Sequence, residues 1–281
     1  MEIFFIEGLN CYTSCVISIA KHLGLPYEVS FYNLWSETSF IYDERFNLYY
    51  TKRMLENLET LGLKLDKVFC DTPEQVEKTL DSVKNLAFLI IGMDAYYLPW
   101  SPIYQLSHDK HYFILQKNNT DSFFCFDPSY GESNIQLPRR EILLHAFEIN
   151  IAEQVPDMSP HMAVKAEAQA IMHMHPNIQE KIFKEIESEK DLALVGRYIG
   201  AFIDNRCLYR YYLNKTISNK YARLFHDNYL MEWKAVKNGI FKASLLQKNA
   251  KIIGEVKSRF SRLIEKEIEM AEQMAETSPL C

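Results

Sequence analysis

A cysteine opens the clearest helical pattern of the chain, and this pattern constrains both the fold and the chemistry near the N-terminus. Apolar residues recur after it at helical spacing, namely Cys15, Val16, Ile19, Ala20 and Leu23. This spacing predicts an amphipathic helix with one buried face. Asn10 is a residue type that caps helix N-termini, and Gly24 and Pro26 are types that end helices. We therefore expect a helix that starts at Cys11 and stops at Gly24.

Cys11 is expected in the first turn of this helix, where the backbone N–H groups have no partner within the helix. The positive end of the helix dipole favours the thiolate form of a cysteine there, and the thiolate is the nucleophile. A small packed side chain is the alternative interpretation of Cys11. Cys15 follows one turn later in the apolar stripe, so we expect it in the core. A third alternative is a metal site with Cys11, Cys15 and His22 as ligands.

The composition indicates a globular protein with free thiols. The 281 residues are 48% hydrophobic and 24% charged, which is enough apolar material for one large domain or two. Six irregularly spaced cysteines form neither a disulfide framework nor a metal-binding CxxC pair, which favours a reducing compartment. No apolar run reaches the ~18 to 20 residues of a membrane helix, and residues 1–7 are too short and acidic for a signal peptide. We expect a cytoplasmic protein without a membrane partner.

The chain changes character near residues 154–159. Strand and helix patterns mix before this point, and helical patterns follow one another after it. We predict an α+β domain of residues 1–155 with an antiparallel sheet, and an all-α domain of residues 156–281. Residues 1–156 contain 12 basic and 21 acidic residues, whereas the remainder contains 19 and 16. No basic stripe points to nucleic acid. The more basic second half suits an acidic partner, and a solvated surface of mixed charge is the alternative.

Local patterns predict most elements of the first domain. Helices are expected at residues 52–61, 72–85 and 139–147, and strands at 63–70, 86–92, 111–116 and 122–126. Residues 27–35 are expected to be extended, and residues 36–50 to form a strand pair or a loop over a cleft. In the second domain we expect helices at residues 162–174, 178–188, 192–212, 218–246 and 250–275.

A histidine and an aspartate are the expected partners of Cys11. His111 begins one predicted strand and Asp127 ends the next, with residues 118–121 as the hairpin turn between them. In an antiparallel hairpin, the start of one strand lies opposite the end of the other, so the two side chains are expected side by side. The spacing thus predicts Cys11 as a nucleophile, His111 as a base and then an acid, and Asp127 as the orienting carboxylate. His108 is an alternative base, and an Asx turn is the alternative role of Asp127.

An aromatic loop follows the strand at residues 86–92. Residues 95–104 hold two prolines and several aromatic side chains, among them Tyr97, Trp100 and Tyr104. Such loops often line a binding site, and surface packing is an equal alternative. We expect these three residues, with Asn10 beside the cysteine, to contact a substrate.

The residues around the triad resemble a known family. Asn10-Cys11-x-x-x-Cys15 running to Gly24, the strand that starts at His111, and Phe126-Asp127-Pro128 are similar to the papain-like fold of bacteriocin-processing (C39-type) cysteine peptidases. A closer resemblance is to the butirosin biosynthesis protein H family, in which such a domain precedes a helical domain. Two stretches of the second half resemble that helical domain, residues 205–213 with Arg206 and Arg210, and residues 232–236 with Trp233.

The resemblance implies acyl transfer in the biosynthesis of a natural product, such as an antibiotic. Family members take an acyl group from a carrier-protein thioester onto their cysteine and deliver it to an amine of a small-molecule intermediate. It implies no metal and no cofactor beyond a phosphopantetheine arm on the carrier protein. The papain-like resemblance also leaves a cysteine peptidase or amidase open, and a non-catalytic binding protein with a degenerate papain-like fold is the third alternative. The oligomeric state stays open, with a homo-oligomer among the alternatives.

Overall fold

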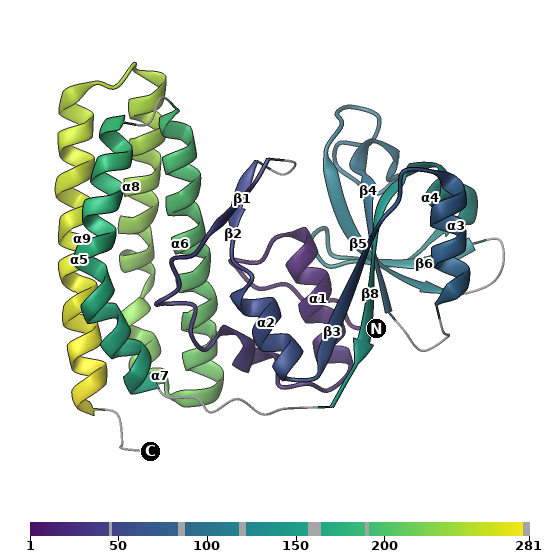
Figure 1. Cartoon of the computed structure of the whole chain (residues 1–281), viewed down its shortest axis with the longest axis horizontal. Helices are drawn as coiled ribbons and strands as arrows, with labels where there is room; N and C mark the ends of the chain where they lie inside the picture. The colour runs from purple at the N-terminus through teal and green to yellow at the C-terminus, as the bar shows by residue number, and fades with distance from the viewer. Residues whose placement is uncertain (45–46, 84–87, 118–121, 157–163, 189–190, 278–281) are drawn as a thin grey trace. The chain divides into compact units, whose positions relative to one another are not determined.

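The computed structural model describes residues 1–44, 47–83, 88–117, 122–156, 164–188 and 191–277, and divides into two compact units (Figure 1). Unit 1 comprises residues 1–27 and 56–160, and unit 2 comprises residues 28–55 and 161–281. Residues 28–55, which the sequence prediction places in the first domain, therefore belong with the helices of unit 2. The hairpin turn expected at residues 118–121 lies outside the described residues.

An antiparallel sheet of six strands forms the centre of unit 1, in the order β3-β8-β4-β5-β6-β7. The strands are β3 (Leu63–Phe69), β4 (Phe88–Asp94), β5 (Lys110–Lys117), β6 (Ser122–Asp127), β7 (Glu132–Pro138) and β8 (Ala146–Gln154). Every neighbouring pair is antiparallel. The chain is thus of the α+β class with an antiparallel sheet, as the sequence predicts.

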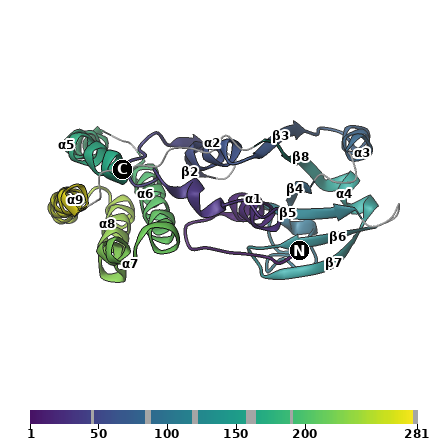
Figure 2. The same cartoon turned by 90° about the horizontal axis from the view of Figure 1, so that it is seen from below.

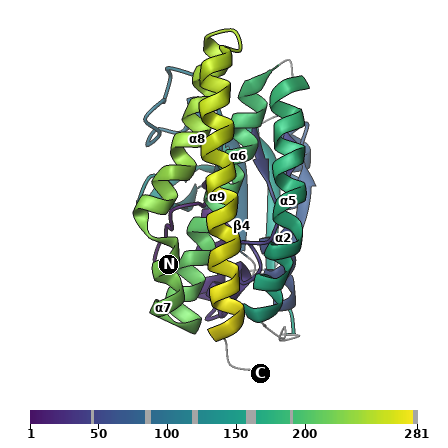
Figure 3. The same ribbon diagram turned by 90° about the vertical axis from the view of Figure 1, so that its left-hand side faces the viewer.

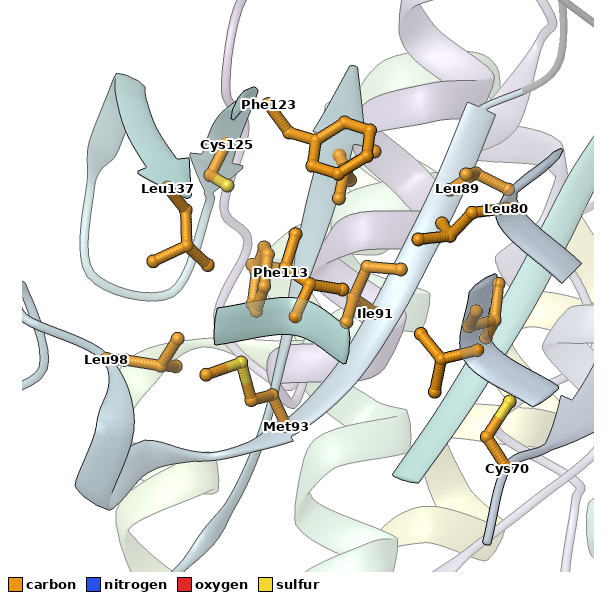
Figure 4. Packing of buried hydrophobic residues seen from close by; sticks show 14 residues of the cluster. Cys70, Leu80, Leu89, Ile91, Met93, Leu98, Phe113, Phe123, Cys125 and Leu137 are labelled. Atoms are coloured by element: carbon orange, nitrogen blue, oxygen red, sulfur yellow. The ribbon is translucent and has the colours of Figure 1, made fainter. Parts of the chain in front are cut away.

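The two faces of this sheet carry different helices. Helix α1 (Cys11–His22) packs on β4 and β5, whereas α3 (Pro73–Ser82) and α4 (Arg139–His145) cover the opposite face (Figure 2). Because side chains alternate along a strand, each face has its own apolar core. Phe113, Ile91 and Ile149 lie in the core under α3 and α4, with Phe123, Cys125 and Leu137 beside them (Figure 4). The cores hold the strand ends at fixed positions.

Close packing on the α1 face requires a glycine in β4. A Cβ atom at Gly92 would lie 2.8 Å from ring carbons of both Phe147 and Tyr112. Both rings therefore rest directly on the backbone of β4, and Tyr112 contacts Tyr12 of α1 edge to face at 5.1 Å. This packing holds the first turn of α1 against the sheet.

Unit 2 is built from long helices that lie side by side (Figure 3). These are α5 (Val164–Ser188), α6 (Leu192–Tyr212), α8 (Asp227–Leu245) and α9 (Ala250–Thr277), with the short α7 (Asn219–Ala222) between α6 and α8. The strand pair β1 (Ile41–Asp43) and β2 (Leu48–Tyr50) belongs to the same unit. Helix α2 (Arg53–Thr60) spans the point where the chain returns to unit 1.

A buried ion pair joins the helices of unit 2. Arg206 of α6 and Glu267 of α9 are both fully buried, with Arg206 Nη2 2.6 Å from Glu267 Oε2. Trp233 donates its indole N–H to the same carboxylate at 3.0 Å, and His175 and Tyr229 also contact it. Burial raises the pKa of Glu267, but the charges of Arg206 and His175 outweigh it and bring the pKa well below the usual range. The two stretches singled out by resemblance, around Arg206 and Trp233, thus meet at one carboxylate.

Several elements differ from the sequence prediction for physical reasons. Residues 27–31 form a 3-10 helix rather than an extended segment. The predicted helices at 162–174 and 178–188 are one helix, α5, and the predicted helix at 218–246 is divided into α7, a 3-10 turn and α8. Strands β7 and β8 were not expected. Most of β7 is exposed at the sheet edge, so it shows little apolar alternation.

Candidate active site

The first turn of α1 positions Cys11. Asn10 is the N-cap: its Oδ1 accepts the backbone N–H of Thr13 at 2.8 Å, while Thr13 Oγ1 accepts the backbone N–H of Asn10 at 2.9 Å. This reciprocal capping box makes Cys11 the first helical residue. The Cys11 side chain is half-buried. The predicted cap and the predicted helix start are both confirmed.

Strands β5 and β6 bring the predicted histidine and aspartate together. Ile114 pairs with Phe126, so the start of β5 lies beside the end of β6. His111 Nε2 lies 2.6 Å from Asp127 Oδ2, and both side chains are buried. A shift of register in the β6–β7 pairing falls between Cys125 and Asp127, where the ladder ends. His111 and Asp127 therefore lie side by side, as the sequence predicts.

Asp127 is fully engaged by donors. Its Oδ2 accepts from His111 and, at 2.9 Å, from the indole N–H of Trp100. Its Oδ1 accepts the backbone N–H groups of Ser129 at 3.1 Å and Tyr130 at 3.3 Å. The Asx turn that was an alternative role is thus formed by one oxygen, while the other orients His111. Both oxygens thus have hydrogen-bond donors in a site without solvent exposure.

The charges around His111 favour its protonated form. Burial lowers the pKa of His111, but hydrogen bonds to Asp127 and Cys11, together with their negative charges, outweigh burial and raise the pKa to about 9. Because Nε2 faces Asp127, Nδ1 is the ring nitrogen left for the Cys11 thiol. At neutral pH this arrangement holds a proton on the imidazole beside the sulfur. Such a pair supplies a thiolate for attack and an acid for the leaving group.

Three side chains pack around His111 and Asp127 and hold them in place. The ring of Tyr130 stacks on His111 with centroids 4.5 Å apart and planes 11° apart. Trp100 donates to Asp127 and packs edge to face on Phe113 at 5.4 Å. Ser101 is buried and hydrogen-bonds Tyr130. Sequence reasoning missed the role of Tyr130, and the only signal for it is an aromatic residue directly after the Asp127-Pro128 turn.

The residues expected to contact a substrate occupy four different environments. The Oδ1 of Asn10 serves in the helix cap, and the indole N–H of Trp100 binds Asp127. Tyr97 stacks on His145 of α4 with centroids 3.6 Å apart. Tyr104 is exposed, and its hydroxyl accepts from Gln105 at 3.1 Å. The structure thus gives Asn10 and Trp100 positioning contacts at the site, and gives Tyr97 packing contacts with α4.

The alternative partners of Cys11 lie elsewhere. His108 is exposed and pairs with Asp94, with Nδ1 2.7 Å from Oδ2, so His111 is the histidine at the cysteine. Cys15 is fully buried, as expected, and its thiol donates to the carbonyl of Tyr112 at 3.6 Å. His22 packs edge to face on Phe88. Across the described residues, no three histidine, cysteine or acidic side chains gather as a metal site.

A buried polar chain adjoins the cysteine on the α1 face. The hydroxyl of Tyr12 donates to Asn150 Oδ1 at 3.2 Å, and Asn150 donates to Glu148 at 2.9 Å. Lys67 lies 3.1 Å from the same Glu148 carboxylate, which is fully buried, and 5.6 Å from the ring centroid of Tyr12. These contacts fix the side chain of the residue that follows Cys11 in the first turn of α1.

No helix in the described part of the chain is long and apolar enough to cross a membrane. In comparisons with known proteins, no protein-family model matches the chain, and no curated protein matches it.

Proposed function

We propose that this protein is a cysteine-dependent acyltransferase whose N-terminal unit has a papain-like fold. The observation that carries the proposal is the position of His111, which hydrogen-bonds the buried carboxylate of Asp127 on one side and Cys11 on the other. Cys11 opens a helix that packs on an antiparallel sheet, and the other two residues lie on adjacent strands of that sheet. This is the order and topology that a papain-like triad requires.

In the first step of the proposed reaction, the Cys11 thiolate attacks the carbonyl carbon of a carrier-protein thioester. A carbon–sulfur bond to Cys11 forms and the bond to the carrier sulfur breaks, with the proton on His111 passing to the leaving thiolate. The exchange replaces one thioester by another, so it is nearly balanced in energy. The backbone N–H of Cys11, at the first position of α1, is among the helix N–H groups without an intrahelical partner and suits the developing oxyanion.

In the second step, a small-molecule amine attacks the acyl-Cys11 carbonyl. His111, now neutral, takes the proton of the amine, and the Cys11 thiolate leaves. Asp127 keeps the imidazole oriented during both steps and stabilises the imidazolium. The product is an amide, and the starting state of the site is restored.

Mass spectrometry of the intact protein tests this function. After incubation with acyl-carrier thioesters, we expect an acyl adduct at Cys11 that is absent in Cys11→Ser and slow to resolve in His111→Ala. Cys70→Ser is the matched control, since it removes another cysteine of the same unit, and it should keep the adduct. Release by an amine supports transfer, release by water alone indicates a hydrolase, and an adduct formed only with peptides indicates a peptidase. Absence of any adduct would overturn the proposal in favour of a binding protein.

Residues 157–281 hold 19 basic and 16 acidic residues, so they are the more basic half of the chain. In this proposal they form the docking region for an acidic carrier protein. Replacing exposed lysines of this region by glutamate should raise KM for the carrier-bound donor. KM for a short pantetheine thioester should not change, because that donor lacks the acidic carrier. An unchanged KM for both donors would refute docking at this region while leaving the acyl-transfer chemistry intact.

A further inference from the structure

A cavity with aromatic walls lies within unit 2, between the β1–β2 strand pair and helices α5 and α6. Phe40 precedes β1, Tyr49 lies on β2, and Tyr198 lies on α6. The rings of Phe40 and Tyr49 each meet Tyr198 edge to face, with centroids 5.2 Å apart and planes at 84° and 90°. The hydroxyl of Tyr198 donates to the carbonyl of Thr38 at 3.0 Å, which fixes this ring against the segment that leads into β1.

The size and lining of the cavity suit one aromatic ring. Its volume is about 180 Å³, and its apolar lining includes Ile182, Leu194 and Val195. An engineered apolar cavity of roughly 150 Å³ in another protein binds benzene. Perpendicular aromatic walls offer both ring faces and ring edges, which is the geometry that a further aromatic ring prefers. The cavity therefore has room for a single ring, with polar groups of the same ligand directed outward.

Two opposite charges border the cavity on one helix. Lys181 and Glu185 are one turn apart on α5, and both line the cavity. Lys181 Nζ lies 5.2 Å from the ring centroid of Tyr198, and the charge of Glu185 contributes to raising the pKa of the Tyr198 hydroxyl to about 12, after burial and Tyr49. Lys184 of the same helix pairs with Glu180 at 2.6 Å, whereas no ion pair within 4.0 Å joins Lys181 to Glu185 in the described part of the chain. A cation and an anion one turn apart match a ligand that carries both charges.

We propose that this cavity binds a free aromatic α-amino acid. The ring occupies the cavity between the aromatic walls and the side chains of Ile182, Leu194 and Val195, the carboxylate faces Lys181, and the ammonium faces Glu185. An aliphatic amino acid lacks the ring that the aromatic walls accommodate, and a monoanion or monocation pairs with only one of the two charges. This site stands independently of the proposed acyl transfer, because all of its residues belong to unit 2.

Isothermal titration calorimetry on the full chain tests the site with four probes. L-phenylalanine should bind, while 3-phenylpropanoate, which lacks the amine, and phenethylamine, which lacks the carboxylate, should each bind at least about tenfold more weakly, the loss of one charge-assisted hydrogen bond. L-leucine should bind more weakly than L-phenylalanine. Cys11→Ser should bind L-phenylalanine like the unmodified chain, so a failure of the acyltransferase proposal does not affect this result.

Variants of α5 and α6 provide the structural control. Lys181→Ala and Glu185→Gln should each weaken L-phenylalanine binding about tenfold or more, whereas Lys184→Ala, an exposed lysine of the same helix, should leave it unchanged. Val195→Phe should fill the cavity and abolish binding, with circular dichroism confirming that the helices are retained. The proposal is overturned if none of the four probes binds. It is equally overturned if Lys184→Ala weakens binding as much as Lys181→Ala, or if 3-phenylpropanoate binds as tightly as L-phenylalanine.

Discussion

The substitution Asp127→Asn tests whether the buried carboxylate sets the protonation of His111. Asparagine keeps the size of the side chain but only one oxygen acceptor, so it can accept from the backbone of the turn or from Trp100, but not from both. It removes the negative charge that, with Cys11, raises the pKa of His111 from 6.5 to about 9 against the effect of burial. That rise favours the imidazolium by about 3 kcal/mol, at about 1.4 kcal/mol per pKa unit.

The expected result is a slower reaction of Cys11 with an alkylating reagent at neutral pH. Without the carboxylate, the largest of the effects that raise the pKa of His111 is lost, and only Cys11 still opposes the effect of burial. The pKa therefore falls from about 9 toward its ordinary value, and a smaller share of the histidine holds a proton at pH 7.5. Alkylation of Cys11 by iodoacetamide should then be slower at this pH, by up to about tenfold, the factor for a pKa that returns fully to 6.5. Its rate should be measured from pH 5 to 10 by mass spectrometry of the Cys11 peptide, because the chain holds five other cysteines.

Asp94→Asn is the matched control for this experiment. Asp94 also pairs with a histidine, His108, at 2.7 Å, but neither side chain is among the groups that shift the pKa of His111. The control should alkylate like the unmodified chain at every pH. If Asp127→Asn also keeps the unmodified rate and pH profile, the carboxylate does not govern His111 and the reasoning is refuted.

The pH dependence of the free energy of unfolding provides a second test of the interaction between His111 and Asp127. Because the pKa of His111 is higher in the folded chain than in the unfolded chain, its stabilising contribution is complete below about pH 6.5 and disappears as pH rises through about 9. Urea unfolding between pH 6 and 10 should show this loss in the unmodified chain, and Asp127→Asn should lack most of it. An identical pH dependence in both proteins would contradict the assignment.

Three further changes test the packing and electrostatics around the site and in unit 2. Trp100→Phe removes a donor to Asp127 and should lower the free energy of unfolding by about 1 to 3 kcal/mol in urea titrations; no change would show that this bond does not stabilise the fold. Gly92→Ala places a Cβ 2.8 Å from two rings and should lower the free energy of unfolding by about 1 to 3 kcal/mol. Gly254 of α9 has open space around it, so Gly254→Ala should raise the free energy of unfolding by about 0.5 to 1 kcal/mol. Equal effects of the two substitutions would contradict the packing described at Gly92. Burial raises the pKa of Glu167 to about 8. The free energy of unfolding should therefore fall as pH rises from about 4.5 to 8, by at most about 1.4 kcal/mol per pH unit. Glu167→Gln should abolish this contribution in urea titrations at the same pH values.

The elements that the sequence predicts well are those whose stabilising contacts are local. The cap at Asn10, the stop at Gly24 and the start of α3 after Thr72 all depend on hydrogen bonds or backbone angles within a few residues. The same holds for the strands that carry His111 and Asp127, whose short separation leaves a hairpin as the simplest connection. Local patterns therefore sufficed to place the cysteine at a helix start and the other two residues at one end of the sheet.

Partners that are distant in sequence decided the rest. Strand β7 has few apolar residues and exists because β6 offers it hydrogen bonds at an edge, and residues 28–55 fold with helices that begin more than a hundred residues later. Trp100 and Tyr130 became positioning residues only because the sheet brings their loops to Asp127 and His111. Local patterning reports which face of an element is apolar, but not which distant element covers that face. The sequence alone therefore predicted Cys11 at the start of its helix and His111 beside Asp127, while tertiary packing determined the hydrogen bonds that hold His111 protonated beside the thiol.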